Sequence, residues 1–261
     1  ELARAQPERL AAATSLSTVI DGFVACLGPL VGGIAFEAMG ARGAVLLAAG
    51  LALIATVSCL SLGLPRSPEA EAGEEVSTFR AALAGFSVLR SSPASIVLLV
   101  IMSLEFVITG AVDILGVAYA QDQLGLGDTA AGLVVAGPGI GTLIGASVLT
   151  GVAQRRYLAA FIAGAAVVQG LLFASTALWH QLVPVVLALA VAGVAGAVTI
   201  LAGRTLLQRT TADQVLARVF AVQESASLLG LALGAILAPR LIESVGLARC
   251  WIPLGLAVAA I

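Results

Sequence analysis

Charged residues are scarce in this sequence of 261 residues: Asp, Glu, Lys and Arg together make up 11%, and neither lysine nor asparagine occurs. Aromatic residues account for only 5%, whereas 60% of the residues are hydrophobic. A soluble domain has about 25% charged residues, so a charged shell this thin could not cover so much apolar surface in water. The composition excludes an ordinary soluble enzyme and a disordered chain.

Several other features are also missing. The formal net charge of −2 offers no basic surface to nucleic acid. The 3 cysteines and the 1 histidine stand far apart, which predicts no metal site, and we expect no cofactor. The alternation typical of transmembrane β-strands is absent, and so are the enzyme motifs HExxH and GxSxG. The remaining class is an all-α membrane protein without catalytic residues, whose main partner is the lipid bilayer.

Apolar stretches long enough to cross a bilayer occur about eight times. A helix needs about 20 predominantly apolar residues to span the hydrocarbon layer. Short breaks containing Gly, Pro, Arg or acidic residues separate the stretches, so consecutive spans should run antiparallel. The predicted spans are about 13–37, 43–64, 94–119, 129–152, 157–178, 184–205, 216–239 and one from about 249, which the end of the chain cuts short.

The arginines predict the orientation. Ten lie in the odd-numbered breaks, counted from the N-terminal segment, and only Arg42, Arg240 and Arg249 lie in even-numbered ones. Cytoplasmic loops carry an excess of positive residues, so we expect the odd-numbered breaks to face the cytoplasm. The lack of Lys and Asn beside abundant Ala, Gly and Arg indicates a GC-rich genome. We therefore expect a multi-pass protein of a bacterial cytoplasmic (inner) membrane.

One break, residues 65–92, is much longer than the others. It opens with prolines and acidic residues and ends in an amphipathic stretch, which predicts a cytoplasmic linker with a helix on the membrane surface. The regions on either side resemble each other weakly. A shift of 206 residues aligns Leu10-Ala11 with Leu216-Ala217, Leu27-Gly28 with Leu233-Gly234, Glu37 with Glu243, and Gly40 with Gly246. Duplicated halves are an architecture of secondary transporters.

Three segments then suggest a family. The stretch 208–220 resembles the loop and helix start before the eleventh helix of the major facilitator superfamily, and 7–13 resembles its counterpart in the first half. Residues 119–126 resemble the outer end of the seventh helix of efflux members. The resemblance implies a partial major-facilitator-type bundle covering roughly helices 5 to 12. Residues 1–64 would then be the last two helices of the N-terminal bundle, 65–92 the linker, and 93–261 a truncated six-helix C-terminal bundle.

Two groups of small residues favour close helix contacts. The run 28–33, with Gly28, Pro29, Gly32 and Gly33, resembles the GPxxGG core of the motif of drug–proton antiporters, although Val24 replaces a further glycine. The span 129–152 carries a second small face, with glycines spaced by four. Small residues let neighbouring helices approach closely in a membrane. We predict that these two helices pack together between the bundles, the second through Gly137, Gly141 and Gly145.

Acidic residues inside spans are the candidate functional groups. Glu105 lies mid-span, Asp21 and Glu224 lie about one helical turn from their span centres, and Asp113 lies nearer the outer end. A charge at the bilayer centre costs about 2.5–3.5 kcal/mol, so it usually faces a cavity or a partner. No interior Arg or Lys is expected to pair with these acids, and burial in a medium of low dielectric favours the neutral carboxylic acid. Such a group can carry protons, or it can simply stay neutral through hydrogen bonds.

The family layout adds further expectations. It implies that Glu105 lines a central cavity, that Asp21 and Glu224 lie at its sides, and that the span 157–178 packs outside it. The leading hypothesis is a secondary active transporter that exports small amphipathic molecules in exchange for protons. Two alternatives stay open: a facilitator or importer without proton coupling, and a transporter-like membrane domain that serves as an anchor or sensor for a fused soluble domain.

Overall fold

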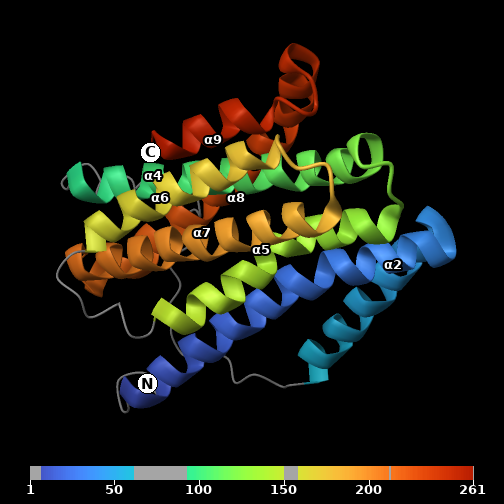
Figure 1. Cartoon of the computed structure of the whole chain (residues 1–261). Coiled ribbons are helices and arrows are strands. Elements are labelled where there is room, and N and C mark those ends of the chain that lie inside the picture. Colours follow the sequence, from blue (N-terminus) through green and yellow to red (C-terminus); the bar gives the residue numbers. More distant parts are fainter. Residues whose placement is uncertain (1–6, 62–92, 150–157, 212, 261) are drawn as a thin grey trace.

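The structure, a computed structural model, describes residues 7–61, 93–149, 158–211 and 213–260, and the regular elements in this part of the chain are all helices (Figure 1). The elements in chain order are α2 (Pro7–Ser61), α4 (Pro93–Ala118), the short π-helix η2 (Tyr119–Gln123), α5 (Asp128–Leu149), α6 (Leu158–Thr176), α7 (Leu182–Thr210), α8 (Asp213–Val245) and α9 (Trp251–Ala259). The all-α fold class is confirmed.

Six of the described helices are long and apolar enough to cross a membrane. The difference from the eight predicted spans arises at two places. The first two spans form the single element α2, which turns at Gly40, and α9 is too short at 9 residues. The other five predicted spans each correspond to one helix, although α7 and α8 extend past the predicted limits. The linker expected at 65–92 lies outside the described residues.

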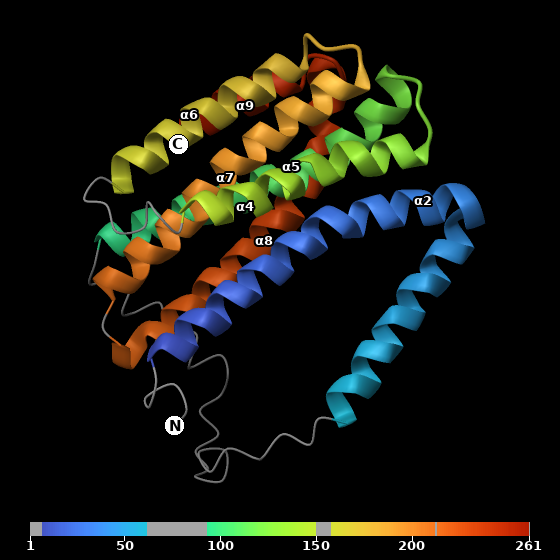
Figure 2. The same ribbon diagram turned by 60° about the horizontal axis from the view of Figure 1, so that its bottom comes forward.

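The turn inside α2 matches the internal repeat. Gly40 has a φ of +68° and Gly246, which the 206-residue shift pairs with it, has a φ of +83°. Only glycine adopts this left-handed region readily, so both positions need that residue. Figure 2 shows the two arms of α2 meeting at the Gly40 turn. The two aligned glycines therefore end their helices in the same way.

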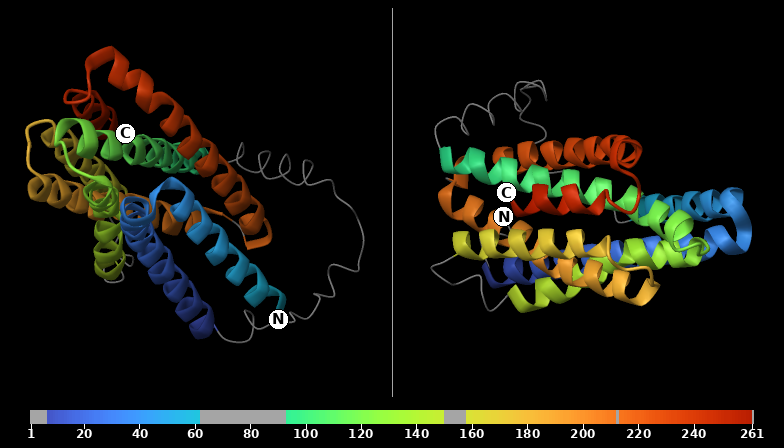
Figure 3. Two further views of the ribbon diagram at one scale, coloured as in Figure 1. Left: turned by 90° about the vertical axis from the view of Figure 1, so that its right-hand side faces the viewer. Right: turned by 45° about the horizontal axis from the view of Figure 1, so that its top comes forward.

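Glycines mark the places where helices touch most closely. Helix α8 packs along α4 (Figure 3), α5 packs on both α2 and α7, and α6 packs on α7 and α9. A Cβ on Gly234 of α8 would overlap the Val107 carbonyl oxygen of α4, and one on Gly141 of α5 would overlap the Ala190 carbonyl oxygen of α7. Because lipid offers no hydrophobic driving force between helices, such backbone-to-backbone contacts carry much of the association.

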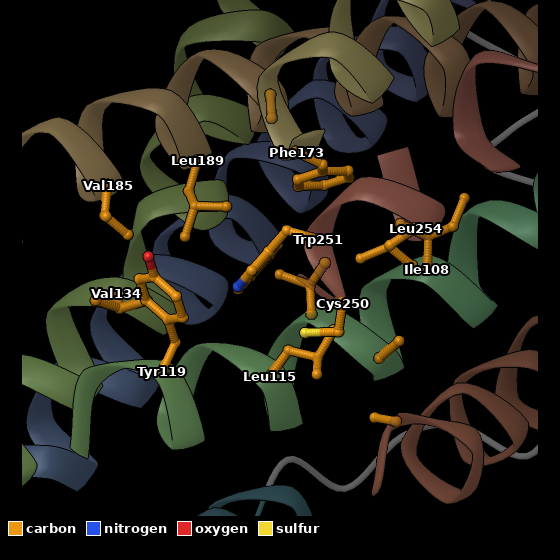
Figure 4. Close-up of a cluster of buried hydrophobic side chains, with 14 of the residues drawn as sticks. Ile108, Leu115, Tyr119, Val134, Phe173, Val185, Leu189, Cys250, Trp251 and Leu254 are labelled. Atoms are coloured by element: carbon orange, nitrogen blue, oxygen red, sulfur yellow. The ribbon is translucent and has the colours of Figure 1, made fainter. Parts of the chain in front are cut away.

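An aromatic cluster fixes one end of the bundle (Figure 4). Trp251, at the start of α9, is fully buried and meets Tyr119 edge to face, with ring centroids 5.8 Å apart. The ring of Phe173 in α6 lies 6.3 Å from the Trp251 ring. The Tyr119 hydroxyl donates a hydrogen bond of 2.6 Å to the carbonyl oxygen of Trp179. The cluster thus joins η2 to α6, to the loop after α6 and to α9.

The α5–α7 contact gives a test of this packing. We expect Gly141→Ala to lower the free energy of unfolding by about 1–3 kcal/mol, because the added methyl group overlaps the backbone of α7. Gly164→Ala in α6 is the matched control, since no atom lies within 4 Å of its Cβ position. Thermal denaturation of both variants in detergent measures the difference. Equal stability of Gly141→Ala and the control would contradict the predicted contact.

Candidate functional site

A cavity of about 270 Å³ lies at the meeting point of five helices. Its wall is mostly apolar and contains few polar side chains. The lining residues come from α2 (Pro29), α4 (Glu105, Ile108, Thr109, Val112, Asp113), α5 (Val135, Pro138, Gly139, Thr142), α6 (Gln169, Phe173) and α7 (Gly193, Gly196, Ala197, Ile200). None of these residues carries a positive charge. The cavity is therefore an apolar chamber with two carboxyl groups in its wall.

Glu105 is the buried acid of this cavity, with 4% of its surface exposed. Its Oε1 accepts a hydrogen bond of 2.5 Å from Nε2 of Gln169, which comes from α6 and is 3% exposed. Taking a carboxylate out of water costs several kcal/mol unless it is paired and hydrogen-bonded. The amide N–H supplies one such bond without supplying a compensating charge.

Gly196 of α7 leaves the space in which this pair forms. A Cβ at this position would lie 2.7 Å from Oε1 of Glu105 and 3.0 Å from Nε2 of Gln169. Any larger side chain would occupy the space in which the carboxyl and the amide meet. The absence of a side chain at Gly196 thus leaves room for Gln169 of α6 to donate its hydrogen bond to Glu105 of α4.

The sequence analysis missed Gln169. The family layout implied that the span 157–178 packs outside the cavity, yet α6 contributes both Gln169 and Phe173 to the wall. One signal was available, since Gln169 is the only polar amide in an otherwise apolar span. Its Oε1 is buried and finds no hydrogen-bond partner among the described residues. A buried acceptor without a partner is costly, so it marks a position where a ligand donor would be favourable.

The other predicted acids lie in different surroundings. Asp113 is half-buried in the same cavity wall, about 12 Å along α4 from Glu105 by helix rise. Asp21 belongs to α2, but its side chain lies outside the part of the chain that the structure describes. Apart from Glu105, Asp113 is therefore the one predicted acid that the structure places in the cavity wall.

The expectation that no interior cation pairs with these acids was wrong for Glu224. Its Oε2 lies 3.5 Å from Nη2 of Arg204, and the side chains are 57% and 38% exposed. The prediction had counted Arg204, at the end of the span 184–205, among the arginines of the odd-numbered breaks, but α7 continues to Thr210, so this arginine lies within the helix. Glu224 of α8 is therefore a partly exposed residue that forms an ion pair with α7, and it lies outside the cavity wall.

The glycine motifs divide between two interfaces. Helix α2 does pack on α5, where a Cβ on Gly33 would lie 2.6 Å from the Asp128 carbonyl oxygen and 3.0 Å from Cα of Gly132. No atom lies within 4 Å of the Cβ positions of Gly28 and Gly32.

The second stripe was assigned to the wrong neighbour. Gly137, Gly141 and Gly145 face α7, where their Cβ positions approach Val186, Ala190 and Ala197. The glycine of α5 that meets α2 is Gly132, which the prediction did not include. Spacing by four identifies a small face but does not say which helix covers it.

A polar contact lies beside the Gly33–Gly132 approach. Oε2 of Glu37 in α2 accepts a hydrogen bond of 3.0 Å from the backbone N–H of Thr129, in the first turn of α5. A carboxylate at a helix N-terminus is stabilised by the unpaired amides and the helix dipole there. Gln121 of η2 donates to Oδ1 of Asp128 at 2.6 Å on the same turn. This end of α5 is thus held by both neighbours.

Among the described residues, no group of three or more His, Cys, Asp or Glu side chains could hold a metal ion. The cavity also contains no glycine-rich phosphate loop or other recognisable cofactor site. The cavity wall offers a protonatable group, a buried unpaired acceptor and apolar surface. Buried ionisable residues inside a transmembrane bundle usually mark a pathway for an ion or a substrate. The fold and the cavity define a multi-pass membrane protein with an internal polar site.

The comparison with known families agrees with this class. The family model of the Major Facilitator Superfamily matches residues 2–234. The chain belongs to this superfamily, and it is a membrane transport protein. Comparison with curated proteins and with solved structures gave no match in either case.

The Gly196 gap can be tested by a double-mutant cycle. We expect Gly196→Ala to cost about 1–3 kcal/mol of unfolding free energy, because the new methyl group displaces the carboxyl–amide pair. The cost should shrink in a Gln169→Ala background, where the amide is already gone. Thermal denaturation in detergent of the single and double variants gives the coupling energy. Strict additivity would show that the methyl group does not act through Gln169.

Proposed function

We propose that this protein is a secondary active transporter that exports small amphipathic molecules in exchange for protons. The observation that carries this proposal is the placement of Glu105. Its carboxyl group is buried in the wall of an internal cavity, holds one hydrogen bond from an uncharged amide, and has no cation beside it among the lining residues. A carboxyl group in such a setting gains and loses a proton without breaking an ion pair.

The helices around the cavity support alternating access. Pro29 of α2 and four helices that follow the 62–92 region all contribute to one wall. Helix α2 meets α5 through backbone at Gly33 and Gly132. In transporters built from two halves, the halves rock against each other around a central site. The cavity lies where such a motion would open it.

The wall of the cavity supports an amphipathic substrate. Ile108, Val112, Phe173 and Ile200 supply apolar surface, while Glu105 and Asp113 supply acidic groups. Small-molecule sites usually combine a largely apolar wall with a few placed polar groups. The direction of transport is proposed from the resemblance of residues 28–33 and 119–126 to efflux members of the superfamily.

The test is transport by the natural protein reconstituted in liposomes. We expect the dye accumulation that a pH gradient drives to fall at least about tenfold in Glu105→Gln, because this side chain no longer exchanges a proton. Downhill dye exchange should persist, since the cavity keeps its shape. A panel of cationic and neutral fluorescent dyes provides the substrates.

Glu243→Gln is the matched control, because Glu243 is an exposed acid at the end of α8. It should transport like the wild type. Gradient-driven accumulation that survives in Glu105→Gln would remove the coupling role from this residue. Dye movement that ignores the pH gradient in the wild type would favour an uncoupled facilitator.

A further inference from the structure

A groove on the surface of the helical bundle lies apart from the central cavity. It has a volume of about 400 Å³ and runs between α4, α8 and α9, and none of the described residues lines both the groove and the cavity. Its wall is apolar apart from Arg240 and Ser244, which lie in the last two turns of α8. A groove that is apolar along its length and charged at one end fits an amphipathic molecule.

The groove has the length of one leaflet of a bilayer. Its residues on α8 run from Gly234 to Ser244, a distance of about 15 Å by helix rise. The hydrocarbon layer is about 30 Å thick, so this distance is about half of it. Gly234 touches Val107, which lies near the middle of α4. The groove therefore runs from the middle of the span to the membrane surface at which α8 ends.

Small residues keep the groove open. Ala111 of α4 and Ala238 of α8 are 5% and 1% exposed, and they form its floor. Leu237 of α8 and Ala257 of α9 are exposed and lie at its rim. An acyl chain can occupy such a space without burying a polar group that lacks a hydrogen bond. The apolar part of the groove therefore suits a lipid tail.

Arg240 determines the charge at the end of the groove. Its side chain is exposed and forms no ion pair within the described part of the chain. Glu243 lies one turn farther along α8, and Arg249 lies in the turn after it, so two positive charges and one negative charge leave a net +1. The Ser244 hydroxyl donates to the Leu241 carbonyl oxygen at 2.9 Å. The side-chain donor that the groove offers to a ligand is therefore the guanidinium of Arg240.

The position of Arg240 is exceptional for this sequence. Of the 13 arginines, ten lie in breaks that are predicted to face the cytoplasm, and two of the other three, Arg240 and Arg249, lie around the end of α8. An arginine near the end of a membrane helix extends its side chain toward the lipid headgroups. Its planar guanidinium donates two parallel hydrogen bonds to a phosphate. The charged end of the groove therefore fits a phosphate at headgroup depth.

We propose that the groove between α4, α8 and α9 binds an anionic phospholipid such as phosphatidylglycerol, with one acyl chain along the apolar wall and the phosphate on Arg240. Free phosphate would use the arginine without the groove, and a hydrocarbon chain would use the groove without the arginine. Phosphatidylcholine offers the same chain and phosphate but brings a cationic group close to Arg240. The site therefore prefers a lipid with a net negative head. This inference does not depend on the proposed transport reaction.

The test uses the natural protein in liposomes that contain phosphatidylglycerol and phosphatidylcholine in equal amounts. A trace of one of the two lipids carries a photoreactive diazirine in its acyl chain, and mass spectrometry of proteolytic fragments locates the adducts after irradiation. We expect the phosphatidylglycerol probe to label segments 234–244 and 253–257 about fivefold more than the phosphatidylcholine probe, as for one basic residue beside an anionic lipid. Equal labelling by the two probes, or no adducts on these segments, would overturn the inference.

Arg240→Gln should lower this ratio to about one, because the variant loses the charge that selects the lipid head. Arg42→Gln is the matched control. Arg42 is the third arginine outside the predicted cytoplasmic breaks, it is also exposed, and it belongs to α2, which does not line the groove. Its variant should keep the wild-type ratio. An unchanged ratio in Arg240→Gln, or an equal fall in both variants, would contradict the proposed role of Arg240.

The apolar part of the site has a variant of its own. Ala257→Phe places a ring at the rim of the groove, so labelling of the groove by both probes should be lost. Ile252→Phe is the control, because Ile252 lies on the same helix, is 42% exposed and stands outside the groove wall. It should be labelled like the wild type. Undiminished labelling in Ala257→Phe would show that the acyl chain does not lie in this groove.

Discussion

The structure depends most on how one carboxyl group is kept inside an apolar bundle. Glu105 is buried at mid-span, and the price of burying it is met by a single amide donor from another helix. The absence of a side chain at Gly196 of α7 leaves room for that donor. The helices α4, α6 and α7 thus each contribute to the surroundings of this carboxyl group. A change in the protonation state of this carboxyl group would alter the hydrogen bond that joins α4 to α6.

The second constraint is how the helices associate in lipid. Water does not drive them together there, so the contacts are made by glycines at which backbones touch. These contacts serve different pairs: Gly234 joins α8 to α4, Gly141 joins α5 to α7, and Gly33 with Gly132 joins α2 to α5. The aromatic cluster around Trp251 adds bulky side-chain packing (Figure 4). Close backbone contacts between helices therefore lie around the cavity.

The sequence was sufficient for the fold class and most of the helices because the bilayer itself sets their length and apolar character. Glu105 and Asp113 could also be found, since a charge inside an apolar span is conspicuous. Gln169 was harder, because an uncharged amide in a span becomes functional only through its partner. That partner depends on how α6 is rotated about its axis, which hydropathy does not report.

The errors have the same origin. The glycine stripe of α5 was recognised but paired with α2 instead of α7, because spacing along one helix says nothing about its neighbours. The pairing of Arg204 with Glu224 was missed because Arg204, at the end of the predicted span 184–205, was counted with the arginines of the following break. One-dimensional patterns find faces and charges, whereas the partners arise from the three-dimensional arrangement.

The Gly33–Gly132 contact has a mechanical consequence. It lies near one end of α5, so in the rocking motion proposed above it would be the fulcrum, and Leu149 would lie about 25 Å from it by helix rise. A tilt of about 10° at the fulcrum moves the far end by about 4 Å, roughly the width of a side chain, while the fulcrum itself hardly moves. Because the Glu37–Thr129 hydrogen bond lies beside the fulcrum, such a tilt would strain it little. The far end of α5 would move most.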